Sequence, residues 1–121
     1  MEQEEKLTLE EVFRDVIKWQ EETFGEGNPI GIAKHIQKEA GELLEQTELD
    51  VVAFGIGMAT PPTQKEVADL FILPINYCKT QKIHVDVIPY VIRHKLQENK
   101  MRQWNKPDSD GVITHVKDGK D

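Results

Sequence analysis

Apolar residues recur every three or four positions along most of this 121-residue chain, which is the spacing of one face of an α-helix. The pattern predicts a first helix over residues 8–24, which opens with Thr8 and Glu11 at capping-box spacing. A second helix is predicted over residues 29–49, with Asn28 as its capping residue. Each of these helices carries an apolar stripe that another element must cover.

The second half of the chain predicts two further helices. Residues 50–64 are rich in Gly and Pro, and we expect the end of a helix followed by a loop there. Thr63 is the expected cap of a third helix over residues 66–79, which is apolar nearly all round. Such a helix belongs at the centre of a bundle or at a subunit interface. Pro74 should kink or divide it, and a fourth helix is predicted over residues 86–104.

Together these elements predict an all-α fold that is similar to a four-helix bundle and has an extended C-terminal tail. We expect one domain over residues 1–121, with its core at about 8–105 and the tail at 106–121. No apolar run approaches the length of a membrane-spanning helix and no export signal is visible, so we expect no membrane partner. The single cysteine, Cys78, excludes an internal disulfide framework and suits a reducing cytoplasm.

The acidic residues give the first indication of chemistry. A net charge of −7 argues against a nucleic-acid partner, which requires clustered Lys and Arg. Glu39 and Glu42 stand three residues apart in the predicted second helix, and Glu39 borders its apolar stripe. Carboxylates are seldom buried unless they are paired or bound to a metal. The simpler interpretation of this pair is a solvated, charged helix face.

Glu66 and Asp69 repeat this spacing in the third helix, and they emerge from an apolar surface around Leu73. The 23 residues between Glu42 and Glu66 allow the chain to return antiparallel, so the two pairs can face each other. Repulsion would then raise the pKa values of the four carboxyl groups unless hard cations such as Mg²⁺ or Mn²⁺ were bound. The competing interpretation makes Glu66 a capping residue.

Lys95, Asn99 and Arg102 form a polar row on the predicted fourth helix, at positions i, i+4 and i+7. A cation, an amide and a guanidinium in a row suit phosphate oxygens. The alternative is a surface with ordinary ion pairs. Combined with the carboxylates, the row indicates recognition of a metal-bound polyphosphate.

These motifs resemble those of a known family. Glu39, Glu42, Glu66 and Asp69 resemble the E-x-x-E…E-x-x-D signature of the MazG-like all-α nucleoside triphosphate pyrophosphohydrolases. Residues 95–104 and the turn and apolar residues after them resemble the C-terminal pattern of the dATP/dGTP diphosphohydrolase branch, known from bacteria and phages. The likeness covers about 13–116.

The resemblance implies a metal-dependent enzyme that hydrolyses a nucleoside triphosphate, dGTP or dATP, to the monophosphate and pyrophosphate. The four acidic residues would hold two or three Mg²⁺ or Mn²⁺ ions, with Glu39 and Glu42 as the catalytic pair. Lys95, Asn99 and Arg102 would take the β and γ phosphates. The resemblance further implies a homo-oligomer, a dimer or tetramer, in the cytoplasm of a bacterium or a phage-infected host.

Three residues are candidates for the base and the sugar. Asn76 lies seven residues after Asp69 on the same helix face, and its amide is suited to read a base edge or a sugar hydroxyl. Trp19 can stack on a base, although a structural tryptophan is an equal alternative. His35 precedes Glu39 by one turn, and we favour a pocket role over a metal ligand.

Two other functions compete with this one. A non-catalytic acidic helical module that binds a partner protein would leave the carboxylates solvated. A phosphohydrolase built on the same carboxylates would differ only in the phosphate bond that it cuts.

Overall fold

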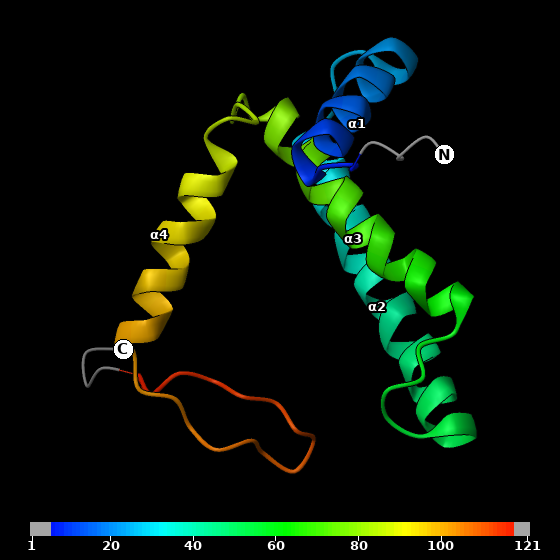
Figure 1. Ribbon diagram of the computed structural model, residues 1–121, viewed down its shortest axis with the longest axis vertical. Helices are drawn as coiled ribbons and strands as arrows, with labels where there is room; N and C mark the ends of the chain where they lie inside the picture. The colour runs from blue at the N-terminus through cyan, green and yellow to red at the C-terminus, as the bar shows by residue number, and fades with distance from the viewer. Residues whose placement is uncertain (1–5, 118–121) are drawn as a thin grey trace. The chain divides into compact units, whose positions relative to one another are not determined.

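The structure, a computed structural model, describes residues 6–117, which form four α-helices and no β-strand (Figure 1). The helices are α1 (Leu9–Phe24), α2 (Pro29–Phe54), α3 (Pro61–Thr80) and α4 (Ile88–Met101). The all-α fold class is thereby confirmed. The chain divides into two compact units, Met1–Val85 and Asp86–Asp121, which are described separately, and the single-domain interpretation stays a prediction.

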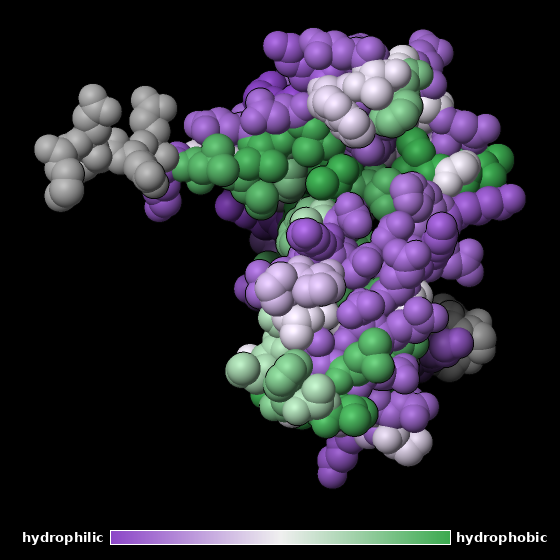
Figure 2. Space-filling view, turned by 90° about the vertical axis from the view of Figure 1, so that its right-hand side faces the viewer, coloured by the Kyte–Doolittle hydropathy of each residue, from purple (hydrophilic) through white to green (hydrophobic). Residues whose placement is uncertain are grey.

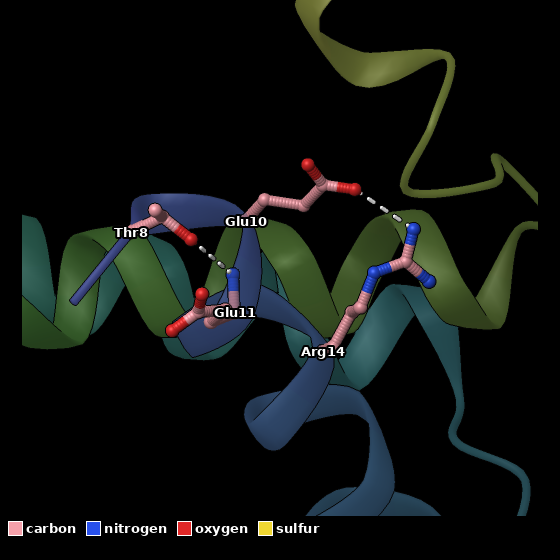
Figure 3. A network of polar contacts seen from close by, with 4 residues as sticks. All are labelled: Thr8, Glu10, Glu11 and Arg14. Carbon is pink, nitrogen blue, oxygen red and sulfur yellow. Dashed lines mark hydrogen bonds and ion pairs between the residues drawn. The ribbon is translucent and has the colours of Figure 1, made fainter. Parts of the chain in front are cut away.

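The start of α1 follows the predicted capping chemistry (Figure 3). Thr8 Oγ1 accepts a hydrogen bond from the backbone N–H of Glu11 at 3.2 Å. One turn of helix further, Arg14 Nη2 lies 2.9 Å from Glu10 Oε1, an exposed pair of the kind that stabilises a helix by a few tenths of a kcal/mol. The predicted bounds of this helix are confirmed.

The second helix begins where it was predicted to begin but ends later. Asn28 Oδ1 accepts hydrogen bonds from the N–H groups of Ile30 and Gly31, at 2.9 and 3.3 Å. The helix continues through Phe54 and stops at Gly55, whose φ of 83° is accessible mainly to glycine. The helix runs five residues past the expected bound of about 49, because residues 50–54 contain no Gly or Pro. The expectation that residues 50–64 hold a helix end followed by a loop is confirmed.

The start of α3 corrects the predicted capping. The capping position belongs to Thr60, and Pro61 and Pro62 fill the first turn, where a missing N–H group costs nothing. Thr63 therefore lies inside the helix, and Glu66 is not at the position that a capping box requires. Pro74 does not divide the helix, which runs without a break to Thr80.

The third helix is the central one of the first unit, as its apolar surface predicted. It packs against α2 and, less extensively, against α1 (Figure 1). The buried apolar core is small, and none of the described side chains is fully buried. Many large apolar side chains reach the surface, some of which Figure 2 shows in green; those on the first unit include Trp19, Phe24, Leu44, Val52, Phe54, Ile56, Met58 and Phe71. No helix in the described part of the chain is long and apolar enough to cross a membrane.

The second unit holds α4 and a loop that doubles back on itself. The helix ends at Met101, earlier than predicted, because Trp104 Nε1 donates to the Asn99 carbonyl at 2.9 Å and turns the chain away. In the tail, Asn105 N–H donates to the Thr114 carbonyl at 2.9 Å, and Trp104 and His115 form an isolated antiparallel bridge. The tail was expected to be extended or loop-like; residues 118–121 lie outside the described part.

Candidate metal centre

Three carboxylates meet where α2 packs against α3. Glu39 and Glu42 come from α2 and Glu66 comes from α3, and one oxygen of each lies within 4.8 Å of the other two. Glu39 is buried, with 9% of its surface exposed, and the other two are half-buried. The two E-x-x-E/D pairs therefore do face each other across antiparallel helices, and the interpretation of a fully solvated face is wrong for these three residues.

The close approach of the three carboxyl groups shifts their pKa values in opposite directions. Glu66, when protonated, donates a hydrogen bond to Glu39, and this bond together with burial raises the pKa of Glu66 to about 7. The pKa of Glu42 is raised for the same first reason, its hydrogen bond to Glu39. The pKa of Glu39 is lowered because it accepts from Glu66 and Glu42, and further because His35 lies beside it. The three carboxyl groups therefore differ in how readily they ionise, Glu39 most readily and Glu66 with a pKa near neutrality.

A second buried carboxylate on α2, that of Asp50, has the hydrogen-bond donors that the carboxylate cluster lacks. The buried residues of α2 are Glu39 and Asp50. Asp50 accepts hydrogen bonds from Thr60 and Thr63, and these bonds lower its pKa. Glu66 Oε2, in contrast, is buried without a hydrogen-bond partner among the described residues. A divalent cation would supply the positive charge that the cluster lacks, and an all-oxygen ligand set fits Mg²⁺ or Mn²⁺.

Asp69, the fourth predicted metal ligand, lies at the edge of this cluster. It is half-buried on α3, one turn after Glu66, and its charge contributes to the raised pKa of Glu66. Its oxygens are not among those within 4.8 Å of one another. The structure therefore brings three of the four predicted ligands together, while Asp69 lies on the wall of a neighbouring cavity that Glu39 also lines.

That cavity, of about 560 Å³, is formed by α1, α2 and α3. It brings together the three residues predicted for the base and sugar, Trp19, His35 and Asn76, and it also reaches Glu39 and Asp69. His35 Nε2 lies 3.1 Å from Glu39 Oε1, which agrees with a pocket role in which the ring orients the carboxylate. The cavity and the carboxylates therefore adjoin.

Two amide side chains face this cavity, and sequence reasoning identified one of them. Asn76 is 6% exposed and Gln20 is 4% exposed, and the amide oxygen of each is buried without a hydrogen-bond partner among the described residues. A buried amide without a partner costs free energy unless something binds it. Gln20 falls at helical spacing from Val16 and Ile17 on the apolar face of α1, and a polar residue on that face is the signal that could have identified it.

Trp19 also lies at this cavity. Its ring contacts Phe24 edge to face, with centroids 5.3 Å apart, and about half of the side chain is exposed. The tryptophan is therefore not a core residue, and its free surface is available to a planar ligand.

The predicted polar row belongs to the second unit, and the structure changes it. Because α4 ends at Met101, Arg102 has an extended backbone and does not continue the helical row of Lys95 and Asn99. Lys95 and Arg102 each lie 3.9 Å from a carboxylate oxygen of Glu98. Exposed pairs at this distance contribute little free energy, so both cations remain able to bind another anion.

The architecture is shared with a solved enzyme. The cyanophage S-2L MazG-like pyrophosphohydrolase, solved bound to dGDP and three catalytic Mn²⁺ ions per active site, superposes with a TM-score of 0.65. Its sequence is 23% identical, and the match covers 93% of the present chain and 97% of that one. The fold is thus the MazG-like all-α fold. A search of curated proteins finds no match.

The sequence itself defines the family more narrowly. The model of the dATP/dGTP pyrophosphohydrolase family matches residues 12–121. The chain therefore belongs to the dATP/dGTP pyrophosphohydrolase family, and it is an enzyme of the class that hydrolyses acid anhydride bonds in nucleotides. The family resemblance and the reaction class inferred from the motifs are confirmed.

Proposed function

We propose that the protein hydrolyses dGTP, dATP or both to the monophosphate and pyrophosphate with the help of two or three Mg²⁺ or Mn²⁺ ions. The observation that carries the proposal is the cluster of Glu39, Glu42 and Glu66, which lacks positive charge beside a cavity of nucleotide size. The dGDP and Mn²⁺ ions bound by the MazG-like structural relative support the same ligands here. The remaining ligand is Asp69, which would close the ion site toward the cavity.

The residues of the chain then have distinct tasks. Bound ions would acidify water and neutralise charge on the phosphates. Glu39 and Glu42 are the catalytic pair, and one of them accepts the proton of the water that attacks the α phosphorus. His35, at 3.1 Å from Glu39, keeps that carboxylate in place. Water adds to the α phosphorus as the bond to the β phosphate's bridging oxygen breaks, which releases pyrophosphate.

The base and sugar occupy the cavity. Trp19 stacks on the purine, while Asn76 and the newly identified Gln20 provide amide groups for its polar edge. An amide can present either its oxygen or its N–H₂ group after a half-turn, so a pair of amides suits both adenine and guanine. The β and γ phosphates are bound by Lys95, Asn99 and Arg102, whose donors suit phosphate oxygens.

We further propose a homo-oligomer, a dimer or tetramer. Several large apolar residues of α2 and of the connection to α3, among them Val52 and Ile56, are exposed, and an exposed apolar patch is typical of an interaction surface. The free thiol of Cys78 and the nucleotide substrate agree with the cytoplasm of a bacterium or a phage-infected host. Sedimentation velocity at micromolar concentration tests the assembly, and a monomer would contradict it.

The reaction is tested by incubating the protein with each of the eight common ribo- and deoxyribonucleoside triphosphates and Mg²⁺ or Mn²⁺. We expect monophosphate and pyrophosphate, separated by anion-exchange chromatography, with the fastest turnover for the purine deoxynucleotides. Diphosphate and phosphate would indicate a phosphohydrolase that cuts a different bond. The protein-binding module predicts no turnover of any nucleotide, and that result would overturn the proposal.

The role of the amide pair has its own test. Gln20→Leu and Asn76→Leu remove the amides while nearly keeping side-chain volume, so the metal-free protein should unfold at the same temperature or higher. We expect KM for dGTP and dATP to rise about tenfold, because each variant loses a hydrogen bond to the base or sugar. Gln37→Leu, on the exposed side of α2, is the matched control. Unchanged KM values in both amide variants would remove them from the base site.

A further inference from the structure

A polar cluster joins the last turns of α2 to the first turn of α3, and its residues are separate from the carboxylates and the cavity. Asp50 Oδ2 accepts from the backbone N–H of Thr60 at 3.1 Å and from the Thr63 hydroxyl at 2.6 Å, and Asp50 Oδ1 accepts from the Thr60 hydroxyl at 2.9 Å. Asp50 is 8% exposed and Thr63 is 4% exposed. We call Asp50, Thr60 and Thr63 the corner clamp.

The two prolines explain why this clamp can form. A helix-capping threonine ordinarily uses its hydroxyl to accept from N–H groups of the first turn. Pro62 removes the N–H group of the second helical position, and the Thr60 side chain makes no capping bond but donates to Asp50. The carboxylate lies at the N-terminus of α3, where the helix dipole favours a negative charge. A residue of α2 thus completes the cap of α3.

The corner clamp and the carboxylate cluster lie on the same pair of helix faces. On α2, Glu42 precedes Asp50 by eight residues, about two turns of helix. On α3, Glu66 follows Thr63 by three residues, about one turn. Hydrogen bonds at the corner therefore act on the same stretch of the two helices that brings the carboxylates together.

Apolar packing alone would fix the position of α3 along α2 less precisely. Burial of apolar surface is non-directional, whereas three hydrogen bonds to one carboxylate fix both distance and angle. A slide of α3 by one residue would move Glu66 by about 1.5 Å, while metal–oxygen distances tolerate only about 0.2 Å. The position of Glu66 relative to Glu39 and Glu42 therefore needs a directional restraint close by.

We propose that the corner clamp is a positioning site that fixes the register of α3 against α2 and thereby sets the geometry of the metal centre. Asp50, Thr60 and Thr63 touch neither ion nor nucleotide in this scheme; they act through Glu66. The inference rests on the proposed function, because it assumes that the carboxylates bind divalent ions.

The test compares Thr63→Val, which removes the hydroxyl, with Thr63→Ser, which keeps it. Free Mn²⁺ is titrated into each protein and followed by its electron paramagnetic resonance signal, with thermal unfolding of the metal-free proteins measured in parallel. We expect Thr63→Val to weaken Mn²⁺ binding about tenfold or more, as loss of supporting partners does at other metal sites. Thr63→Ser should stay within about twofold of the unchanged protein, because the supporting hydroxyl is kept.

Thr47→Val is the matched control. The Thr47 hydroxyl donates to the Leu43 carbonyl at 2.7 Å on an exposed part of α2, so its loss removes a hydroxyl without touching the connection. Mn²⁺ affinity should not change. If Thr63→Val lowers only the unfolding temperature and binds Mn²⁺ as before, the clamp serves stability alone and the inference is overturned.

The remaining outcomes are also distinguishable. If Thr63→Val does not fold, the test uses Thr60→Val, which keeps two of the three hydrogen bonds to Asp50. Weaker Mn²⁺ binding by Thr60→Val supports the inference, and unchanged binding overturns it. If the unchanged protein itself binds no Mn²⁺, the proposed function fails, and the corner clamp loses its basis with it.

Discussion

Replacing Glu39 by Gln should lower turnover of dGTP by roughly 10³-fold or more, while the metal-free protein stays folded. Glu39 is the carboxylate to which both Glu42 and Glu66 donate, so it is the centre of the cluster. Without its charge an ion loses a ligand and the attacking water loses a candidate base, a role that alone accounts for about 10²–10⁴ in rate. The amide oxygen of Gln can still accept hydrogen bonds from Glu42 and Glu66, so the metal-free protein should keep its fold.

The measurement is kcat for dGTP with saturating Mn²⁺, together with thermal unfolding in a chelator. Glu48→Gln removes the same charge from an exposed position on α2 and serves as the control, for which we expect unchanged kcat. If Glu39→Gln prevented folding, Glu39 would be a structural residue and the proposed catalytic pair would be wrong.

The starts of the first two helices could be predicted because their determinants are local. Thr8 and Asn28 bind N–H groups two or three residues away, so the spacing in the sequence contains the interaction. The first turn of α3 and the end of α4 also involve partners five or more residues away. Thr63 is bound by Asp50, thirteen residues before it, and the Asn99 carbonyl by the indole of Trp104. Such partners cannot be read from a capping pattern.

The candidate site likewise has features that the sequence could predict and features that it could not. Glu39 could be found because a carboxylate beside an apolar stripe conflicts with burial, and Glu66 because it repeats that conflict on the next long helix. The sequence could not show that Glu66 lies within 4.8 Å of the other two while Asp69 does not, since this depends on how α3 sits against α2. Asp50 escaped notice because its partners, Thr60 and Thr63, lie ten and thirteen residues further along the chain, beyond the reach of a helix pattern.

The metal-free protein should lose stability as the pH rises from about 5 to 8, and saturating Mn²⁺ should reverse that trend. Glu66 has a pKa of about 7, above the 4.5 of an unfolded chain, so its contribution is present below pH 4.5 and lost as the pH rises through 7. The raised pKa of Glu42 acts in the same direction. Asp50 and Glu39 have lowered pKa values, and their contributions are lost only at more acidic pH.

Bound ions reverse the dependence of folding stability on pH because they bind the ionised carboxylates. Mn²⁺ at about 100 times its Kd would stabilise the folded protein by about 2.7 kcal/mol, and its affinity should rise with pH as Glu66 loses its proton. The check is the unfolding temperature from pH 5 to 8, in chelator and in Mn²⁺. Glu66→Gln should flatten the metal-free curve and remove most of the Mn²⁺ effect, because a neutral side chain neither titrates nor attracts the ion. A metal-free curve that rises with pH would show that Glu66 ionises without cost, and the cluster would then need no cation.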